Sequence, residues 1–315
     1  MTQTHLAGLN AERRWCVTAT PFVSCPDDIY KQGLFLGFNR SFLIHTLVSA
    51  VGSKQSSNRN KDAFYAGVDL LKKIMIRHTK DQEIGGAPAL ALPESTTLRR
   101  LLDMTCAEKQ LYDAGKLKIT WVRNKGARPF TLDARIASHL VLKGENAPTK
   151  INALLQDINR VRIKDPNLKA VVFTQYKDTH QACVKALQLA GILTHEFSGS
   201  TNASARDKVI RLFQENTAFQ VFVVTLKSGA VGVTLTAASR VYLMEPCINP
   251  ALMLQAAGRV HRLGQTKKVK VIKFAFKNSF EANILRFHRK MADGSATMSA
   301  DFVPPGSIEI LMKGL

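Results

Sequence analysis

The stretch KAVVFTQ, residues 169–175, decides the fold class of this 315-residue chain. Its apolar side chains follow one another without alternation, which is typical of a strand buried on both faces of a sheet. FQVFVVT at 219–225 and RVYLMEP at 240–246 repeat the pattern, and VKVIKFAF at 269–276 indicates a further strand with a basic face. Together these runs predict the central strands of a parallel sheet.

Helical patterns separate the strands. They cover residues 178–191, 204–216, 250–264 and 280–290. Neighbouring parallel strands need long crossover connections, so helices on the faces of the sheet are expected. The first 150 residues instead combine helical patterns with a loop rich in glycine and proline at 82–96. We therefore expect an α/β lobe preceded by a mostly helical region.

The composition favours a polyanionic partner. Lys and Arg number 44 against 24 Asp and Glu, and this net charge of +20 points to nucleic acid rather than a small acidic molecule. The five cysteines form no C-x-x-C pair and no histidine spacing matches a metal site, so no metal ligands are expected in this chain. Neither a long apolar run nor a charged-then-apolar leader occurs, so no membrane partner is expected.

Ligands of parallel sheets gather at the carboxyl ends of the strands. Here these ends carry polar or glycine-rich segments: Thr174 with Gln175, SGST at 198–201, LKSGAVGVT at 226–234 and EPCINP at 245–250. The sequence therefore predicts a binding edge formed by these loops.

The stretch LQAAGRVHRLGQTKKVK, residues 254–270, places Gln255, Arg259 and Arg262 at i, i+4 and i+7, on one stripe of a helix. A neighbouring apolar stripe consists of Leu252, Ala256, Val260 and Leu263. Two guanidiniums repel each other unless an anion lies between them, and their planar donors suit phosphate oxygens. The stripe thus indicates an anion receiver, and the alternative is a solvated charged face with surface ion pairs.

Several segments, taken in order, resemble the motifs of Swi/Snf-type helicase-like ATPases of superfamily two. RRWCVTATPF at 13–22 resembles the third motif, VVFTQY at 171–176 the fourth, VVTLKSGAVGVTLTAASRVYLMEP at 223–246 the fifth and QAAGRVHRLGQTKKV at 255–269 the sixth. IMIRHTKDQ, LPE and CAEKQLYD resemble the segment between the two lobes. WCVT at 15–18 and EPCINPALMLQAAGRVHRLGQ at 245–265 are most similar to the branch of post-replication-repair translocases.

The resemblance implies the C-terminal half of such an enzyme. Residues 1–23 would end the first RecA-like lobe, 24–150 would form a helical inter-lobe region, 151–292 the second RecA-like lobe or helicase C-terminal domain, and 293–315 a C-terminal tail. The implied activity is ATP-dependent translocation on double-stranded DNA in chromatin remodelling or DNA repair, in the nucleus if the source is eukaryotic and otherwise in the cytoplasm. ATP and Mg²⁺ are the implied cofactors, and double-stranded DNA, chromatin and the N-terminal ATPase lobe are the implied partners.

The resemblance also assigns roles to single residues. Arg262 and Arg259 match the sixth-motif arginines that reach ATP on the other lobe, with Arg262 as the arginine finger. Gln255, Gly229 and Gly232 would contact nucleotide, since a glycine backbone can approach phosphate closely. The residues that would hold the phosphates of a DNA strand are Thr174, Gln175, Ser198, Gly199, Ser200, Thr201 and Lys227.

Departures from the family pattern leave the activity of the chain open. The sequence contains no G-x-x-x-x-G-K-[ST] loop and no D-E-x-H segment for magnesium. Thr234 replaces the usual Asn of the fifth motif, and Ala19 the usual Gly of the third. We expect the chain alone to be inactive as an ATPase. Two alternatives stay open: a catalytically inactive nucleic-acid-binding module, and an interaction protein that supplies Arg259 and Arg262 to a complete ATPase in trans.

Overall fold

The computed structural model describes residues 10–17, 27–44, 69–76, 82–123, 149–197, 201–229 and 233–293. The chain divides into two compact units, one containing the described residues up to Ala89 and the other extending from Leu90 to Asp293. The first unit contains α2 (Asp27–Phe35), α3 (Arg40–Leu43) and the short antiparallel pair β1 (Glu83–Ile84) and β2 (Ala87–Pro88). Its described core is small and centres on the fully buried Leu43.

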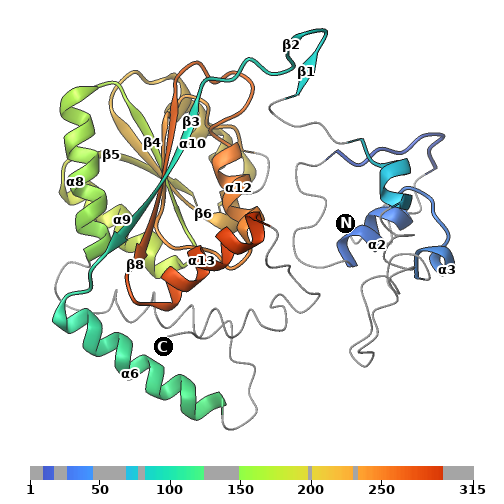
Figure 1. Cartoon of the computed structure of the whole chain (residues 1–315). Coiled ribbons are helices and arrows are strands. Elements are labelled where there is room, and N and C mark those ends of the chain that lie inside the picture. Colours follow the sequence, from blue (N-terminus) through green and yellow to red (C-terminus); the bar gives the residue numbers. More distant parts are fainter. Residues whose placement is uncertain are drawn as a thin grey trace. The chain divides into compact units, whose positions relative to one another are not determined.

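The second unit is built around a six-stranded parallel sheet with the strand order β3-β8-β7-β4-β6-β5 (Figure 1). The strands are β3 (Ser95–Leu102), β4 (Lys169–Thr174), β5 (Leu193–Phe197), β6 (Gln220–Thr225), β7 (Arg240–Leu243) and β8 (Val269–Phe276). β4 and β7 are buried at every position, as their continuous apolar runs predict. The expected parallel α/β fold is confirmed.

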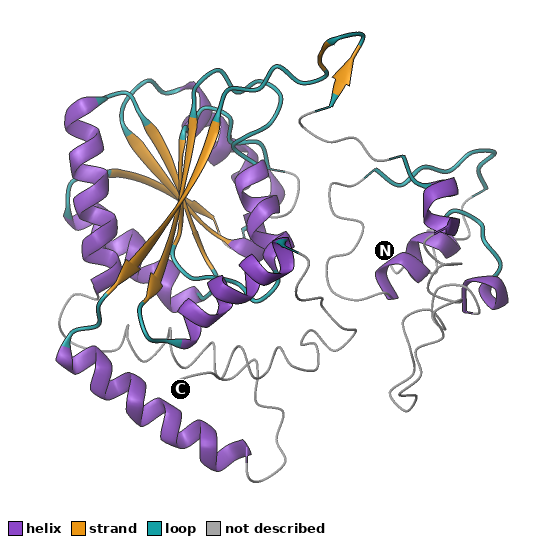
Figure 2. Ribbon diagram, in the orientation of Figure 1, coloured by secondary structure: helices purple, strands orange, loops and turns teal. Residues whose placement is uncertain are grey.

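Helices cover both faces of this sheet (Figure 2). On one face, α8 (Thr149–Lys164) and α9 (Lys177–Leu189) pack against the strands through Leu154 and Leu187. On the other face, α10 (Ala203–Glu215) and α12 (Pro250–Gly258) do so through Phe213 and Met253. The remaining helices of this unit are α6 (Cys106–Arg123), α11 (Leu226–Gly229) and α13 (Phe280–Ala292). None of the helices in the described ranges is long and apolar enough to cross a membrane.

The edge strand β3 lies in a segment that the sequence assigns to the helical inter-lobe region and partly to a loop. It pairs with β8 along all eight of its residues. Arg100 and Leu102 are half-buried and the other residues of this strand are exposed. Its sequence therefore has neither a continuous apolar run nor a regular alternation of apolar and polar residues. In the structure β3 belongs to the same unit as the other strands of this sheet.

The start of α6 also belongs to the second unit. The backbone N–H of Phe280 donates to the Tyr112 hydroxyl at 2.8 Å. The buried carboxylate of Glu108 accepts hydrogen bonds from the backbone N–H of Thr149 at 2.8 Å and from its hydroxyl at 2.6 Å. These bonds fix the first turns of α6 against α8 and α13.

Candidate functional site

The helix α12 begins as the sequence predicts but ends earlier. Asn249 caps it by accepting a hydrogen bond from the N–H of Ala251 at 2.9 Å, and Pro250 occupies its first turn. The predicted helix over 250–264 ends at Gly258, where the carbonyl of Arg259 accepts a hydrogen bond from the N–H of Leu235 at 2.9 Å. This bond turns the chain toward another loop instead of continuing the helix.

The predicted apolar stripe is therefore only partly correct. Ala256 and Val260 are fully buried, whereas Leu263 is 70% exposed. Arg259 and Arg262 do not lie on one straight helix, because only Gln255 belongs to α12 and the two arginines follow it in turns. The predicted single helical stripe is therefore wrong, and the functional role of the two arginines stays a prediction.

The two guanidiniums nevertheless lie close enough to influence each other. Burial, followed by the positive charge of Arg262, lowers the pKa of Arg259. Arg262 is exposed, and its Nη1 donates to the Thr234 hydroxyl at 3.1 Å. In the part of the chain that the structure describes, Arg262 forms no ion pair, so a surface ion pair does not account for its position. The pair has the properties of an anion receiver.

The loop that carries Thr234 is held by α10. The side-chain amide of Gln214 donates from Nε2 to the Thr234 carbonyl at 2.8 Å and accepts at Oε1 from the N–H of Ala237 at 2.9 Å. The sequence marks Thr234 as a departure from the family pattern, and the structure shows its hydroxyl beside Arg262. Their separation of 28 residues along the chain explains why periodicity gave no sign of this contact.

Two side chains fix the arginine segment, residues 258–265, to the start of the sheet. Gln265 is 6% exposed and donates to the carbonyls of Ala238 at 2.8 Å and Val260 at 3.0 Å. The Nε2 of His261 lies 2.7 Å from the carbonyl oxygen of Pro93. The arginine segment thus lies near the residues that precede β7, β8 and β3, at the amino edge of the sheet. His261 thus links the arginine segment to the residues just before β3.

The carboxyl edge, where the sequence predicts DNA contacts, uses its polar groups internally. Thr174 is fully buried, and its hydroxyl faces the Tyr176 carbonyl at 3.5 Å. Gln175 donates from its backbone N–H to Glu245 Oε2 at 3.0 Å and from Nε2 to the Pro246 carbonyl at 2.9 Å. These bonds join the loop after β4 to the loop after β7. A direct DNA contact by the Thr174 hydroxyl does not fit this arrangement.

Glu245 is the residue of this edge that sequence reasoning missed. It is 2% exposed, and burial raises its pKa to about 7, although the Lys150 ammonium acts in the opposite direction. Lys150 also forms a buried ion pair with Glu281 at 2.5 Å. A single glutamate in EPCINP carries no periodic signal, so only the fold reveals that it is buried in a charged cluster.

The other predicted site residues are described in part or not at all. Gln255 is half-buried on α12, one turn before Arg259. Thr201 is half-buried just before Asn202, which caps α10 by accepting from the N–H of Ala205 at 2.8 Å. Lys227 and Gly229 belong to the short α11. The predicted residues Ser198, Gly199, Ser200 and Gly232, and the third-motif segment at 18–22, lie outside the described residues.

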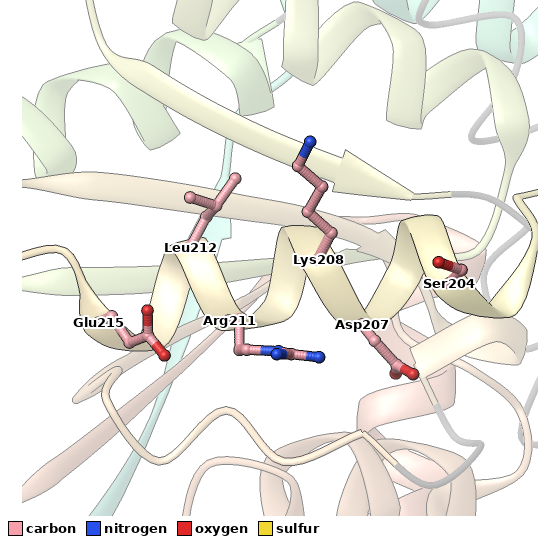
Figure 3. A pocket seen from close by; sticks show the side chains of 6 residues that line it. All are labelled: Ser204, Asp207, Lys208, Arg211, Leu212 and Glu215. Atoms are coloured by element: carbon pink, nitrogen blue, oxygen red, sulfur yellow. The ribbon is translucent and has the colours of Figure 1, made fainter.

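An open cavity of about 560 Å³ lies along the outer face of α10 (Figure 3). Its charged lining consists of Asp207, Lys208, Arg211 and Glu215. Opposite charges balance in this cavity, so it offers no net attraction to phosphate. Within the described ranges, no group of three His, Cys, Asp or Glu side chains could hold a metal ion.

Comparisons with known proteins agree with this architecture. Residues 149–264 match the family model described as the helicase conserved C-terminal domain. The chain is similar to the ATP-dependent helicase rhp16 of Schizosaccharomyces pombe, with 34% identity over 160 residues, which cover 51% of this chain and 19% of rhp16. It is 37% identical over 150 residues to the helicase-like transcription factor of Mus musculus, covering 47% of this chain and 15% of that protein.

A third relative is the DNA repair protein RAD5 of Candida albicans, 33% identical over 159 residues, which cover 49% of this chain and 15% of RAD5. The chain spans less than a fifth of the length of these curated relatives. Among solved structures, the Sulfolobus solfataricus SWI2/SNF2 ATPase C-terminal domain matches with a TM-score of 0.53 and 17% identity, covering 70% of this chain and 100% of that domain.

The Sulfolobus solfataricus SWI2/SNF2 ATPase core in complex with dsDNA matches with a TM-score of 0.56 and 19% identity, covering 99% of this chain and 69% of that core. At such identities the structural likeness shows the fold. The second unit has the fold of the C-terminal lobe of these ATPases, as the sequence predicts.

Proposed function

We propose that this chain is the C-terminal half of an ATP-dependent translocase on double-stranded DNA, since residues 149–264 match the helicase conserved C-terminal domain and the second unit has the fold of the SWI2/SNF2 ATPase C-terminal lobe. In this proposal the chain supplies the arginine finger and one DNA-binding lobe, and a separate N-terminal lobe holds the nucleotide. The curated relatives named for helicase activity and for DNA repair support a repair role, and chromatin remodelling and a nuclear location belong to the same proposal.

The observation that carries the proposal is the arginine pair. Arg262 is exposed on the arginine segment, and it donates to Thr234 in the loop that Gln214 of α10 holds in place. Negative charge builds on the phosphoryl oxygens during transfer, and a guanidinium from a second lobe stabilises that charge only when the lobes close. Hydrolysis would thereby be coupled to lobe closure.

The residues around the pair fit the phosphates of ATP. Arg259 and Arg262 offer planar N–H donors, and the Thr234 hydroxyl orients one of them. Mg²⁺ prefers carboxylate oxygens and water, and the N-terminal lobe would supply those ligands in the complete enzyme. When bound, the metal would neutralise charge between the phosphates. This chain would position the guanidinium.

The DNA partner is supported by the net charge of +20 and by the similarity to an ATPase core solved with dsDNA. The predicted residues Ser198, Gly199, Ser200, Thr201 and Lys227 keep this role in the proposal, whereas the fully buried Thr174 does not. Phosphate contacts of this kind position a backbone without reading bases. Affinity should therefore depend steeply on salt and little on sequence.

A reconstitution separates the proposal from its alternatives. The chain alone should release no phosphate from ATP, whereas a two-lobed protein carrying this sequence should hydrolyse ATP and be stimulated by duplex DNA. Phosphate release and duplex binding are measured on both proteins. A folded two-lobed protein that binds DNA with the expected salt dependence but never turns over ATP would contradict the proposal, and would support the inactive nucleic-acid-binding module.

A further inference from the structure

A second cavity, of about 330 Å³, lies at the amino edge of the sheet, where β3, β8 and β7 begin. The strand register aligns Thr96 of β3, Lys270 of β8 and Arg240 of β7 in one row. Aligned residues of neighbouring strands point to the same face, here the face that α8 and α9 cover. The row therefore brings a hydroxyl, an ammonium and a guanidinium to one wall of the cavity.

The polar groups of this cavity are available for a ligand. Lys270 is half-buried, and among the described residues its ammonium has neither an ion-pair nor a hydrogen-bond partner. The Ser239 side chain is 7% exposed, and its hydroxyl likewise has no partner in the described part of the chain. Both groups line a cavity that is open to solvent, so both can donate to an acceptor on a ligand that enters it.

The charge around the cavity selects the kind of acceptor. Arg240 donates to Asp157 from Nε at 3.0 Å and from Nη2 at 2.7 Å, while Arg160 and Arg100 also pair with this single carboxylate. Lys268 pairs with Glu94 at 3.0 Å on the rim. With Lys270, the described surroundings hold five cations and two carboxylates. The cavity on α10, whose charges balance, has no such excess (Figure 3).

We propose that this cavity binds a phosphate group, held by the Lys270 ammonium and the hydroxyls of Ser239 and Thr96. Its long-range attraction comes from the unbalanced arginines beside it. The site is distinct from the arginine pair, because Lys270 lies on the α8 face of the sheet whereas α12, which leads to Arg259, packs on the other face. The phosphate belongs either to a nucleic-acid backbone or to a free phosphate compound.

The first experiment titrates the full chain with orthophosphate at constant ionic strength, using calorimetry, and compares Lys270→Gln with Lys273→Gln. Lys273 is the matched control because it lies on the same strand but on the opposite face, and it is also half-buried. Lys270→Gln should weaken orthophosphate binding about tenfold, since one charge-assisted hydrogen bond is lost. Lys273→Gln should leave it unchanged.

The second arm repeats the comparison with a short DNA duplex at several salt concentrations. If the bound phosphate belongs to a nucleic-acid backbone, Lys270→Gln lowers the affinity for the duplex. The slope of log affinity against log salt concentration then falls by about one, and orthophosphate competes less well with the duplex. If a free phosphate compound is the source, orthophosphate binding depends on Lys270 and duplex affinity does not.

The proposal is overturned if Lys270→Gln and Lys273→Gln are folded and match the original chain in both arms. Should Lys270→Gln not fold, Ser239→Ala decides, because it removes a single oxygen that has no internal partner in the described residues. A severalfold loss of orthophosphate or duplex affinity in Ser239→Ala supports the site, and unchanged binding of both contradicts it.

Discussion

The two edges of the parallel sheet differ in what their polar groups bind. At the carboxyl edge, Thr174, Gln175 and Glu245 bond to groups within the protein. At the amino edge, Arg262 and Lys270 present charged groups that form no ion pair among the described residues. Ligands favour carboxyl edges in such folds, but that tendency does not identify which side chains are available. Here two cations without an ion pair among the described residues, Arg262 and Lys270, lie at the opposite edge.

Each edge also contains a buried carboxylate, and the two have opposite pKa shifts. Burial alone would raise the pKa of Asp157, but hydrogen bonds from Arg240 and Tyr242 hold it below the ordinary value. Burial raises the pKa of Glu245 to about 7, and the charge of Glu281 acts in the same direction, whereas Lys150 acts against it. Ionised Asp157 therefore stabilises the fold, whereas ionised Glu245 destabilises it.

The largest expected effect in this comparison is that of Asp157→Ala. Removing the carboxylate leaves Arg240, which is 9% exposed, without its counter-charge, so the free energy of unfolding should fall by roughly 3–5 kcal/mol at pH 7. Urea denaturation of the variant and the original chain measures the difference. Because the pKa of Asp157 is lowered, the difference should shrink as the pH falls below its ordinary value of 3.8.

The exposed Asp178 on α9 provides the matched control. Asp178→Ala should change the free energy of unfolding by about 1 kcal/mol or less. If Asp157→Ala loses no more free energy of unfolding than this control, the arginines around Asp157 do not depend on its carboxylate for stability.

A smaller effect, with the opposite pH dependence, is expected for Glu245→Gln. Protonated Glu245 makes its full contribution to the free energy of unfolding below its ordinary pKa of 4.5. This contribution is lost as the pH rises through about 7. The amide cannot ionise and still offers an oxygen to the Gln175 N–H. Relative to the original chain, the variant should therefore gain stability from pH 4.5 to pH 8, by up to about 3 kcal/mol.

Thermal unfolding across this pH range measures the gain, and Glu215→Gln on the exposed face of α10 is the control. If the stability difference between Glu245→Gln and the original chain does not change with pH, as expected for the control, the opposite pKa shifts of Asp157 and Glu245 are contradicted.

The sequence predicts the parts of this fold whose burial dominates. β4, β6 and β7 have nearly continuous apolar runs because both of their faces are covered. β3 gives no such signal, since its outer positions are exposed and its pairing with β8 is set by backbone bonds. The helix α12 was predicted too long because Val260 is buried, as a helical stripe requires, even though the chain has already left the helix.

For the candidate site, the sequence indicates which arginines lie near each other but not what surrounds them. Arg259 and Arg262 were identified by their spacing, which still places them near each other. Their contact with Thr234, the support from Gln214 and the burial of Thr174 depend on tertiary contacts that sequence spacing does not encode. The same holds for Lys270, whose partners in the row come from two other strands.

The most direct test of the central claim is a pair of titrations on Arg262→Ala in a two-lobed protein carrying this sequence: ATP turnover at saturating DNA, and affinity for duplex DNA. We predict that turnover falls on the order of 10³-fold with little change in DNA affinity. Arg262→Lys should not restore turnover, because an ammonium lacks the planar fork. Arg211→Ala, at the exposed α10 surface, should leave turnover intact. Lost DNA affinity with normal turnover in Arg262→Ala would contradict the account and assign the arginine to the DNA surface.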